Sequence, residues 1–174
     1  DFSKSGHSLC IVDTGGNHSA LTDDYAAVRG EMEAVAEAMG KKVLREIEYD
    51  DFFAALPELQ KKVNDRALIR AMHFYAENKR VDNAVNCLES GDFDGFRKDI
   101  VASGYSSFMY NQNVYTPKNP TDQRLSLALA MTQAVLGDRG AYRVHGGGFA
   151  GTIQAFVPND MLENYKKVME GVFG

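Results

Sequence analysis

The fold of this chain is most constrained by residues 141–157, in which a cluster of glycines separates two stretches of alternating apolar and polar residues. The cluster contains four glycines: Gly146, Gly147, Gly148 and Gly151. Such a cluster is typical of a backbone that adopts positive φ angles or that another surface approaches closely. Because residues 152–157 alternate with a period of two, they are expected to form a strand. We therefore predict a strand, a tight glycine loop and a second strand.

The spacing of these glycines matches a dinucleotide-binding pattern, but the residues around them do not. Gly146, Gly148 and Gly151 satisfy G-x-G-x-x-G, which requires a helix to open at the third glycine. A strand is predicted there instead, and the Gly-Lys-Ser/Thr ending of a P-loop is missing. Clustered N–H groups without side chains still form an anion-binding concavity, which favours phosphate handling. The alternative is a glycine-rich hairpin on which another segment packs.

Composition excludes several classes of partner. The 174 residues, 44% of them hydrophobic, are enough for one domain with a substantial core. A net charge of −5 and the lack of a basic run argue against nucleic acid as a partner. No apolar run approaches the ~20 residues needed to span a bilayer, and no basic-then-apolar leader begins the chain. We expect a cytoplasmic protein with neither a nucleic-acid nor a membrane partner.

The two cysteines and the scattered histidines do not suggest a metal centre. Cys10 and Cys87 lie far apart, with no C-x-x-C pair and no histidine cluster, so neither a zinc site nor a disulfide framework is predicted. We expect both to be buried thiols and expect no metal site in the chain.

Hydrophobic periodicity outlines the remaining elements. The predicted elements are a strand over residues 7–13, a helix over 22–39, an extended connector over 44–47, a brief helix from Asp50 that Pro57 ends or separates from the next, a long helix over 65–88, a helix from Asp92, a long loop or frayed helix end over 105–120, a helix from Thr121 or Asp122 to Leu136, and a final helix from Asn159. Few strands and several long helices predict an α+β fold, with a small antiparallel sheet backed on one face by helices.

The long helix over residues 65–88 carries an apolar stripe that we expect to be buried. Its members recur at spacings of three, four or seven: Ala67, Ala71, Phe74, Val81, Val85 and Leu88. Gly91 is expected to end this helix and Asp92 to cap the next one.

Several of these motifs together resemble a known family, the galactokinase branch of the small-molecule kinases that also includes homoserine, mevalonate and phosphomevalonate kinases. The run from Arg143 to Thr152, Arg-Val-His-Gly-Gly-Gly-Phe-Ala-Gly-Thr, is similar to that family's third motif. The strand and turn ending at His18, followed by Asp24-Tyr25, resemble its strand, turn and Glu-Tyr segment. The Leu-Arg connector near Val43 and the junction Glu89-Ser-Gly-Asp92 match in order.

The resemblance runs nearly end to end and is to the C-terminal half of these enzymes. It implies a ferredoxin-like C-terminal lobe of a two-lobed kinase, with residues 1–174 as a single domain and the N-terminal lobe absent. It further implies ATP-dependent phosphorylation of galactose at its anomeric hydroxyl, with Mg²⁺ spanning the phosphates. The catalytic residues would belong to the missing lobe. We therefore expect a piece of a longer polypeptide that is inactive alone and whose uncovered face promotes self-association.

The resemblance also implies roles for particular residues. Tyr25 is expected to bind the sugar, and the loop glycines Gly146, Gly147, Gly148 and Gly151 are expected to support the nucleotide's phosphate-binding loop. His145 and Ala150 depart from the Thr and Gly that are usual in the motif. These departures leave open a kinase acting on another sugar, or a non-catalytic galactose or ATP sensor.

Other candidate residues have ordinary explanations beside the functional ones. His145 is next to the glycines but is expected to be structural, and His18 and His73 are expected to be ordinary. Asp23 and Asp24 are explained as helix-start charges. Arg139 and Arg143 either offer charge to an anion or form surface pairs. The group Tyr105, Phe108, Tyr110 and Tyr115 either walls a cleft or packs the long loop.

Overall fold

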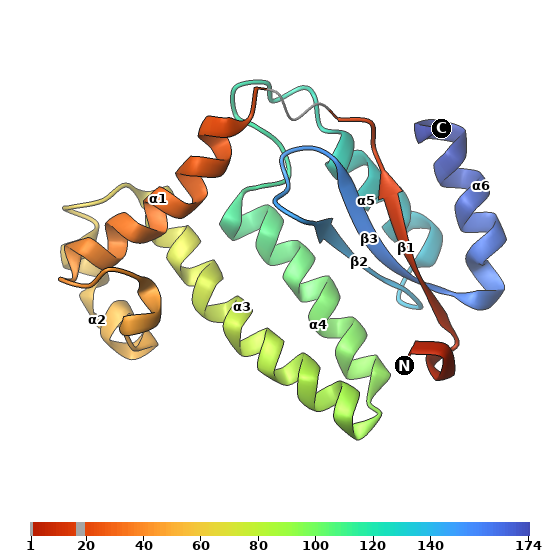
Figure 1. The fold of residues 1–174 in the computed structure, drawn as a ribbon, viewed down its shortest axis with the longest axis horizontal. Coiled ribbons are helices and arrows are strands. Elements are labelled where there is room, and N and C mark those ends of the chain that lie inside the picture. Colours follow the sequence, from red (N-terminus) through yellow and green to blue (C-terminus); the bar gives the residue numbers. More distant parts are fainter. Residues whose placement is uncertain (1, 17–19) are drawn as a thin grey trace.

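The structure is a computed structural model that describes residues 2–16 and 20–174, and its centre is a three-stranded sheet. The strands are β1 (His7–Asp13), β2 (Ala141–His145) and β3 (Thr152–Pro158). Their order is β1-β3-β2, and β3 pairs antiparallel with both neighbours (Figure 1). The hairpin predicted around the glycines thus forms the centre and one edge of the sheet.

Helices make up most of the remainder. They are α1 (Thr22–Ala38), α2 (Tyr49–Leu59), α3 (Asp65–Ser90), α4 (Phe93–Ser106), α5 (Arg124–Leu136) and α6 (Leu162–Phe173), with short 3₁₀ turns at Phe2–Ser5, Leu44–Glu46 and Asn159–Met161 and a π-helical turn at Ser107–Asn111. This arrangement confirms the predicted α+β class with a small antiparallel sheet.

The helices cover both faces of the sheet, whereas the sequence predicted cover on one face. Helices α5 and α6 pack on the face that carries Ile153, which is fully buried. Helix α4 packs on the opposite face, where Phe96 meets Phe156 edge to face at 5.2 Å between ring centroids. The large aromatic side chain of Phe156 on the nominally polar face provides the apolar surface on which α4 rests.

The junction between α3 and α4 has the helix end at Gly91 and the cap at Asp92 that the sequence predicted. The side chain of Asn64 caps α3 by accepting a hydrogen bond from the Ala67 N–H, and Gly91 ends the helix with a φ of 76°. The side chain of Asp92 then caps α4 by accepting from the N–H of Gly95 at 2.9 Å. The chain reverses tightly there, and α3 and α4 lie side by side (Figure 1).

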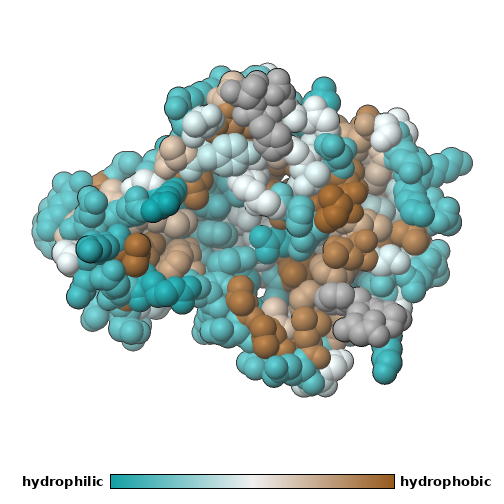
Figure 2. Space-filling model, viewed as in Figure 1, coloured by the Kyte–Doolittle hydropathy of each residue, from teal (hydrophilic) through white to brown (hydrophobic). Residues whose placement is uncertain are grey.

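The apolar stripe of α3 is buried only along its first half. Ala67 and Ala71 lie in a core shared with α1 and α2, whereas Val81, Val85 and Leu88 are 56%, 47% and 43% exposed. The prediction of a continuous buried stripe is therefore wrong beyond Phe74. Helix α3 runs past α1 toward the lower end of the molecule, where apolar residues gather at the surface (Figure 2).

Several predicted boundaries also differ. Leu44–Glu46 forms a 3₁₀ turn instead of an extended connector, and Pro57 lies inside the last turns of α2 instead of ending it. Helix α5 begins at Arg124, and α4 continues into the π-helical turn at Ser107–Asn111, so the irregular segment is shorter than predicted. Among residues 2–16 and 20–174, no helix combines the length and hydrophobicity required to cross a membrane.

Candidate functional site

The loop between β2 and β3 has the backbone geometry that its glycines predicted. Gly146, Gly148 and Gly151 have φ angles of 75°, 81° and 92°, and Phe149 joins them at 60°. Side chains disfavour this left-handed region, which glycine occupies without a steric penalty. Gly146 and Gly147 are exposed, and the chain from Gly148 to Ala150 is buried. The loop therefore has one buried side and one open end.

Tyr25, in the first turns of α1, packs against this loop. A Cβ atom at Gly147 would lie 2.7 Å from the Tyr25 Cε1 atom, so only glycine leaves room for the ring. The Tyr25 hydroxyl donates a hydrogen bond of 2.8 Å to the carbonyl oxygen of Gly148. Phe149 meets the same ring edge to face at 5.4 Å. The structure thus brings together the predicted sugar-binding tyrosine and the predicted glycine loop.

Asn113 holds the loop from the other side, and sequence reasoning missed it. Its side-chain N–H donates to the carbonyl of Gly147 at 3.0 Å, and its own carbonyl accepts from the N–H of Phe149 at 2.5 Å. A side chain at Gly148 would overlap the Asn113 carbonyl. In the sequence, the polar Asn-Gln-Asn run at 111–113, within a segment predicted to be irregular, could have indicated a residue that binds main-chain groups. The requirement for glycine at 147 and 148 therefore comes from packing within the chain.

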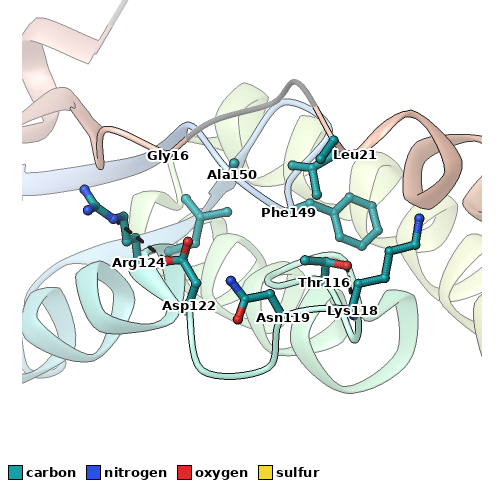
Figure 3. Close-up of a pocket in the computed structure, with 11 residues that line it drawn as sticks. Gly16, Leu21, Thr116, Lys118, Asn119, Asp122, Arg124, Phe149 and Ala150 are labelled. Carbon is teal, nitrogen blue, oxygen red and sulfur yellow. Dashed lines mark hydrogen bonds and ion pairs between the residues drawn. The ribbon is translucent and has the colours of Figure 1, made fainter.

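An open pocket lies beside the loop (Figure 3). It has a volume of about 250 Å³. Phe149, Ala150, Gly16 and Leu21 line one side, and the segment from Thr116 to Arg124 lines the other. Its floor reaches the start of α5, so the pocket combines main chain from two glycine-containing turns with charged side chains.

The charged groups around this pocket are paired. Lys118 Nζ lies 3.0 Å from Asp23, and Arg124 Nε lies 3.8 Å from Asp122. Arg124 also donates to the Thr14 carbonyl at 3.2 Å. The side chains of both ion pairs are more than half exposed. Each pair is therefore held weakly. An anion entering the pocket can therefore compete for either cation.

The acids at the start of α1 have a second role besides the expected helix-start charge. The buried Asp24 carboxylate accepts a hydrogen bond of 3.1 Å from the Thr116 hydroxyl. With the Asp23 to Lys118 pair, this contact ties the segment after the π-helical turn to α1. Burial, together with the Asp24 carboxylate, raises the pKa of Tyr25. Tyr25 is therefore protonated at neutral pH and able to donate its hydrogen bond.

The remaining histidine and arginine candidates lie in ordinary environments. His145 contacts the Gln154 side chain at 3.1 Å, and buried His73 contacts the Ser106 hydroxyl at 2.8 Å. Arg139 forms a surface pair with Asp160, as predicted, whereas the pair of Arg143 with Glu77 is partly buried. His18 lies outside the described residues.

The aromatic group and the cysteines complete the predicted candidates. None of Tyr105, Phe108, Tyr110 and Tyr115 lines the pocket of Figure 3. Both cysteines are free thiols; Cys87 is buried, as predicted, whereas Cys10 is only half-buried. Across the described part of the chain, no three histidine, cysteine or acidic side chains gather where they could hold a metal ion.

A three-stranded antiparallel sheet with helices on both faces, and with the glycine loop between two of its strands, defines the fold class as α+β. The chain superposes on the crystal structure of Lactococcus lactis galactokinase in complex with galactose with a TM-score of 0.78, over 97% of this chain and 42% of that one, at 21% identity. Its fold is that of a galactokinase C-terminal domain.

Within that class, the sequence is similar to bacterial galactokinases. It is 29% identical to galactokinase from Actinobacillus pleuropneumoniae over 164 residues, which cover 94% of this chain and 41% of the relative. Galactokinase from Haemophilus influenzae is likewise 29% identical, over 93% of this chain and 40% of the relative. No family model matches. The chain thus resembles the C-terminal part of these sugar kinases and spans about two fifths of their length, which confirms the predicted resemblance.

Proposed function

We propose that this chain is the C-terminal lobe of a galactokinase-type enzyme that transfers a phosphoryl group from ATP to the anomeric hydroxyl of galactose when joined to an N-terminal lobe. The observation that carries this proposal is the similarity to galactokinases over 94% of the chain. Galactokinases from Actinobacillus pleuropneumoniae, Mannheimia succiniciproducens and Haemophilus influenzae are among its relatives, which does not favour a sensor. Residues 1–174 would form one domain of the two-lobed enzyme.

Tyr25 is proposed to contact the sugar. Its hydroxyl hydrogen is directed to the Gly148 carbonyl, so a further hydrogen bond from a sugar hydroxyl would be accepted by the phenol oxygen. The bond to Gly148 would fix the height of that oxygen relative to the glycine loop. Tyr25 would thereby position the sugar and the loop relative to each other.

The glycine loop is proposed to support the nucleotide through its open end. Gly146 and Gly147 are exposed, and no atom lies within 4 Å of a Cβ built on Gly146. Gly148 and Gly151, which lie deeper, would hold the loop in shape. ATP would supply the phosphoryl group. Main-chain N–H groups of the loop, and Lys118 or Arg124 beside the pocket, would stabilise the negative charge that develops on the transferred phosphate.

The residues of this chain fit part of the ATP site but not the magnesium ion. The open glycine main chain and the two cations suit phosphate oxygens. The described acids, in contrast, do not gather where they could hold a metal. The ligands of Mg²⁺, like the catalytic residues, would therefore come from the N-terminal lobe.

The proposal is tested by supplying that lobe. The N-terminal part of the Actinobacillus pleuropneumoniae enzyme would be fused to this chain and assayed for ADP release with galactose and ATP. We expect galactose-dependent turnover from the fusion, none from the chain alone, and a raised KM for galactose in a Tyr25→Phe fusion. A folded fusion that binds ATP but shows no galactose-dependent ADP release would contradict the proposed function. The Tyr110→Phe fusion is the matched control, because Tyr110 is 40% exposed and belongs to the π-helical turn, not to α1 or the glycine loop.

A further inference from the structure

A second groove lies between α4 and α5, beside the edge strand β2, and shares no residue with the pocket of Figure 3. Its volume is about 320 Å³, and it opens into a neighbouring hollow of about 640 Å³. The two hollows have Val101, Tyr105, Gln133 and Tyr142 in common. Small-molecule sites are typically about 300–1,000 Å³, so the groove is large enough for one ring system.

The lining of this groove is uncharged, and most of its surface is apolar. None of its ten residues is acidic, basic or a histidine. Val101, Leu129 and Ala130 provide aliphatic surface, and Phe108 provides an aromatic ring that is 49% exposed. A phosphate or another ionic ligand would find no counter-charge in this groove, since Arg97, Lys98 and Asp138 line only the neighbouring hollow.

Two tyrosines, two glutamines and a serine provide the polar groups of the lining. The Gln133 side-chain N–H donates to the Tyr105 hydroxyl at 3.1 Å. Burial and a hydrogen bond with Tyr105 raise the pKa of Tyr142, so its hydroxyl is neutral. The hydroxyl oxygen of Ser126, also part of the lining, is buried and has no hydrogen-bond partner among the residues that the structure describes. Neutral donors and acceptors are thus set within an aromatic and aliphatic wall.

We propose that this groove is a binding site for a small, uncharged, planar aromatic molecule with one hydrogen-bonding group, of the indole or phenol class. A flat ring fills a space bounded by Tyr105, Phe108 and Tyr142 and gains ring-to-ring contacts that an aliphatic ring cannot make. Its polar group pairs with the tyrosine hydroxyls, the Gln133 amide or the Ser126 hydroxyl. This site is independent of the proposed sugar and nucleotide sites.

The test is an NMR titration of the isotope-labelled chain with indole, with cyclohexanol as a non-aromatic probe. We expect saturable shifts centred on the backbone amides of Gly104, Tyr105, Gln133 and Tyr142. Ala130→Trp places a ring in the groove and should weaken indole binding by about tenfold or more, since the apolar contact of one ring is lost.

Leu127→Trp is the matched control. Leu127 lies on the same helix and is 50% exposed, but it does not line the groove, so indole binding should be unchanged. Should Ala130→Trp fail to fold, Ala130→Leu gives the same test with a smaller blockage. Equal indole affinity in the folded Ala130 variant, shifts spread over the whole chain, or equal affinity for cyclohexanol would each overturn the proposal.

Discussion

The hydroxyl of Tyr25 donates a hydrogen bond of 2.8 Å to the carbonyl oxygen of Gly148, joining the first turns of α1 to the loop between β2 and β3. These residues are 123 positions apart, and the bond connects the proposed sugar contact to the proposed nucleotide support. Any change in this contact is therefore expected to affect both loop geometry and stability.

Removing this hydroxyl should destabilise the protein. In Tyr25→Phe the carbonyl of the buried Gly148 loses one of its two donors and keeps the Ala150 N–H at 2.7 Å, while the ring contacts remain. The free energy of unfolding should therefore fall by about 0.5–1.5 kcal/mol. Urea unfolding followed by circular dichroism measures the change. Tyr110→Phe serves as the control, because Tyr110 is 40% exposed, and it should change stability by less than about 0.5 kcal/mol. Equal effects of the two substitutions would contradict the assigned role of the hydrogen bond.

Adding a methyl group at Gly147 should be harmful because of Tyr25. The new Cβ would lie 2.7 Å from the Tyr25 ring, and overpacking of this kind typically costs about 1–3 kcal/mol. In a Tyr25→Ala background the clash is absent, so Gly147→Ala should then be nearly neutral. Gly30→Ala is the control: no atom lies within 4 Å of its Cβ position in α1, so alanine should stabilise the helix by about 0.5–1 kcal/mol. Additive effects of the Gly147 and Tyr25 substitutions would rule out the steric explanation.

Arg70 should be among the most sensitive positions outside the loop. Its side chain is only 2% exposed, pairs with Glu31 at 2.8 Å and donates to the Asn111 carbonyl at 2.9 Å. Arg70→Ala removes one of the two arginines that pair with Glu31, which keeps Arg66 at 2.6 Å, and takes the Arg70 donor away from the Asn111 carbonyl. The substitution should cost about 1–3 kcal/mol. The surface pair of Arg29 and Glu33, with side chains 84% and 37% exposed, is the control, and Arg29→Ala should cost less than about 1 kcal/mol. Comparable losses in the two variants, measured by urea unfolding, would show that burial does not set the strength of the Arg70 pair.

Local patterns in the sequence predicted the elements but not their contacts. The glycine hairpin and the turn at Gly91 and Asp92 could be predicted because each depends on neighbouring residues. The contact of Asn113 with Gly147 joins residues 34 positions apart, and no local pattern indicates it. Periodicity placed Val81 and Val85 on one face of α3, but it does not show whether another element covers that face.

Arg70 is a polar residue whose burial the local sequence pattern does not indicate. A lone arginine on an amphipathic helix is typical of a solvated face, yet this one is buried because Glu31 of α1 and the π-helical turn close over it. The family resemblance singled out Tyr25 and the loop separately, and no local pattern indicates their contact, because the hydroxyl and its acceptor are 123 positions apart in the chain.

His73 should make stability depend on pH. Its imidazole is 9% exposed and contacts the Ser106 hydroxyl at 2.8 Å. Burial lowers the pKa of His73, the Glu77 carboxylate opposes this effect, and Arg80 and Arg143 add to it. Below the unfolded-state pKa of about 6.5, the unfolded chain binds this proton more readily than the folded chain. Stability should therefore fall as the pH decreases from about 6.5 toward the lowered folded pKa and should level off below it.

The measurement is the urea unfolding free energy between about pH 8 and pH 5.5, a range above the ordinary pKa values of the carboxylates. His73→Gln removes the titrating group while keeping a polar side chain, so its stability should vary less with pH than that of the unsubstituted chain, although its absolute stability will be lower. His145→Gln is the control, because His145 is exposed and its ring contacts the exposed end of the hairpin through the Gln154 side chain. This variant should retain the pH dependence of the unsubstituted chain. If His73→Gln and the unsubstituted chain lose stability in parallel as the pH falls, the proton responsible binds elsewhere, and the lowered pKa of His73 has no effect on folding.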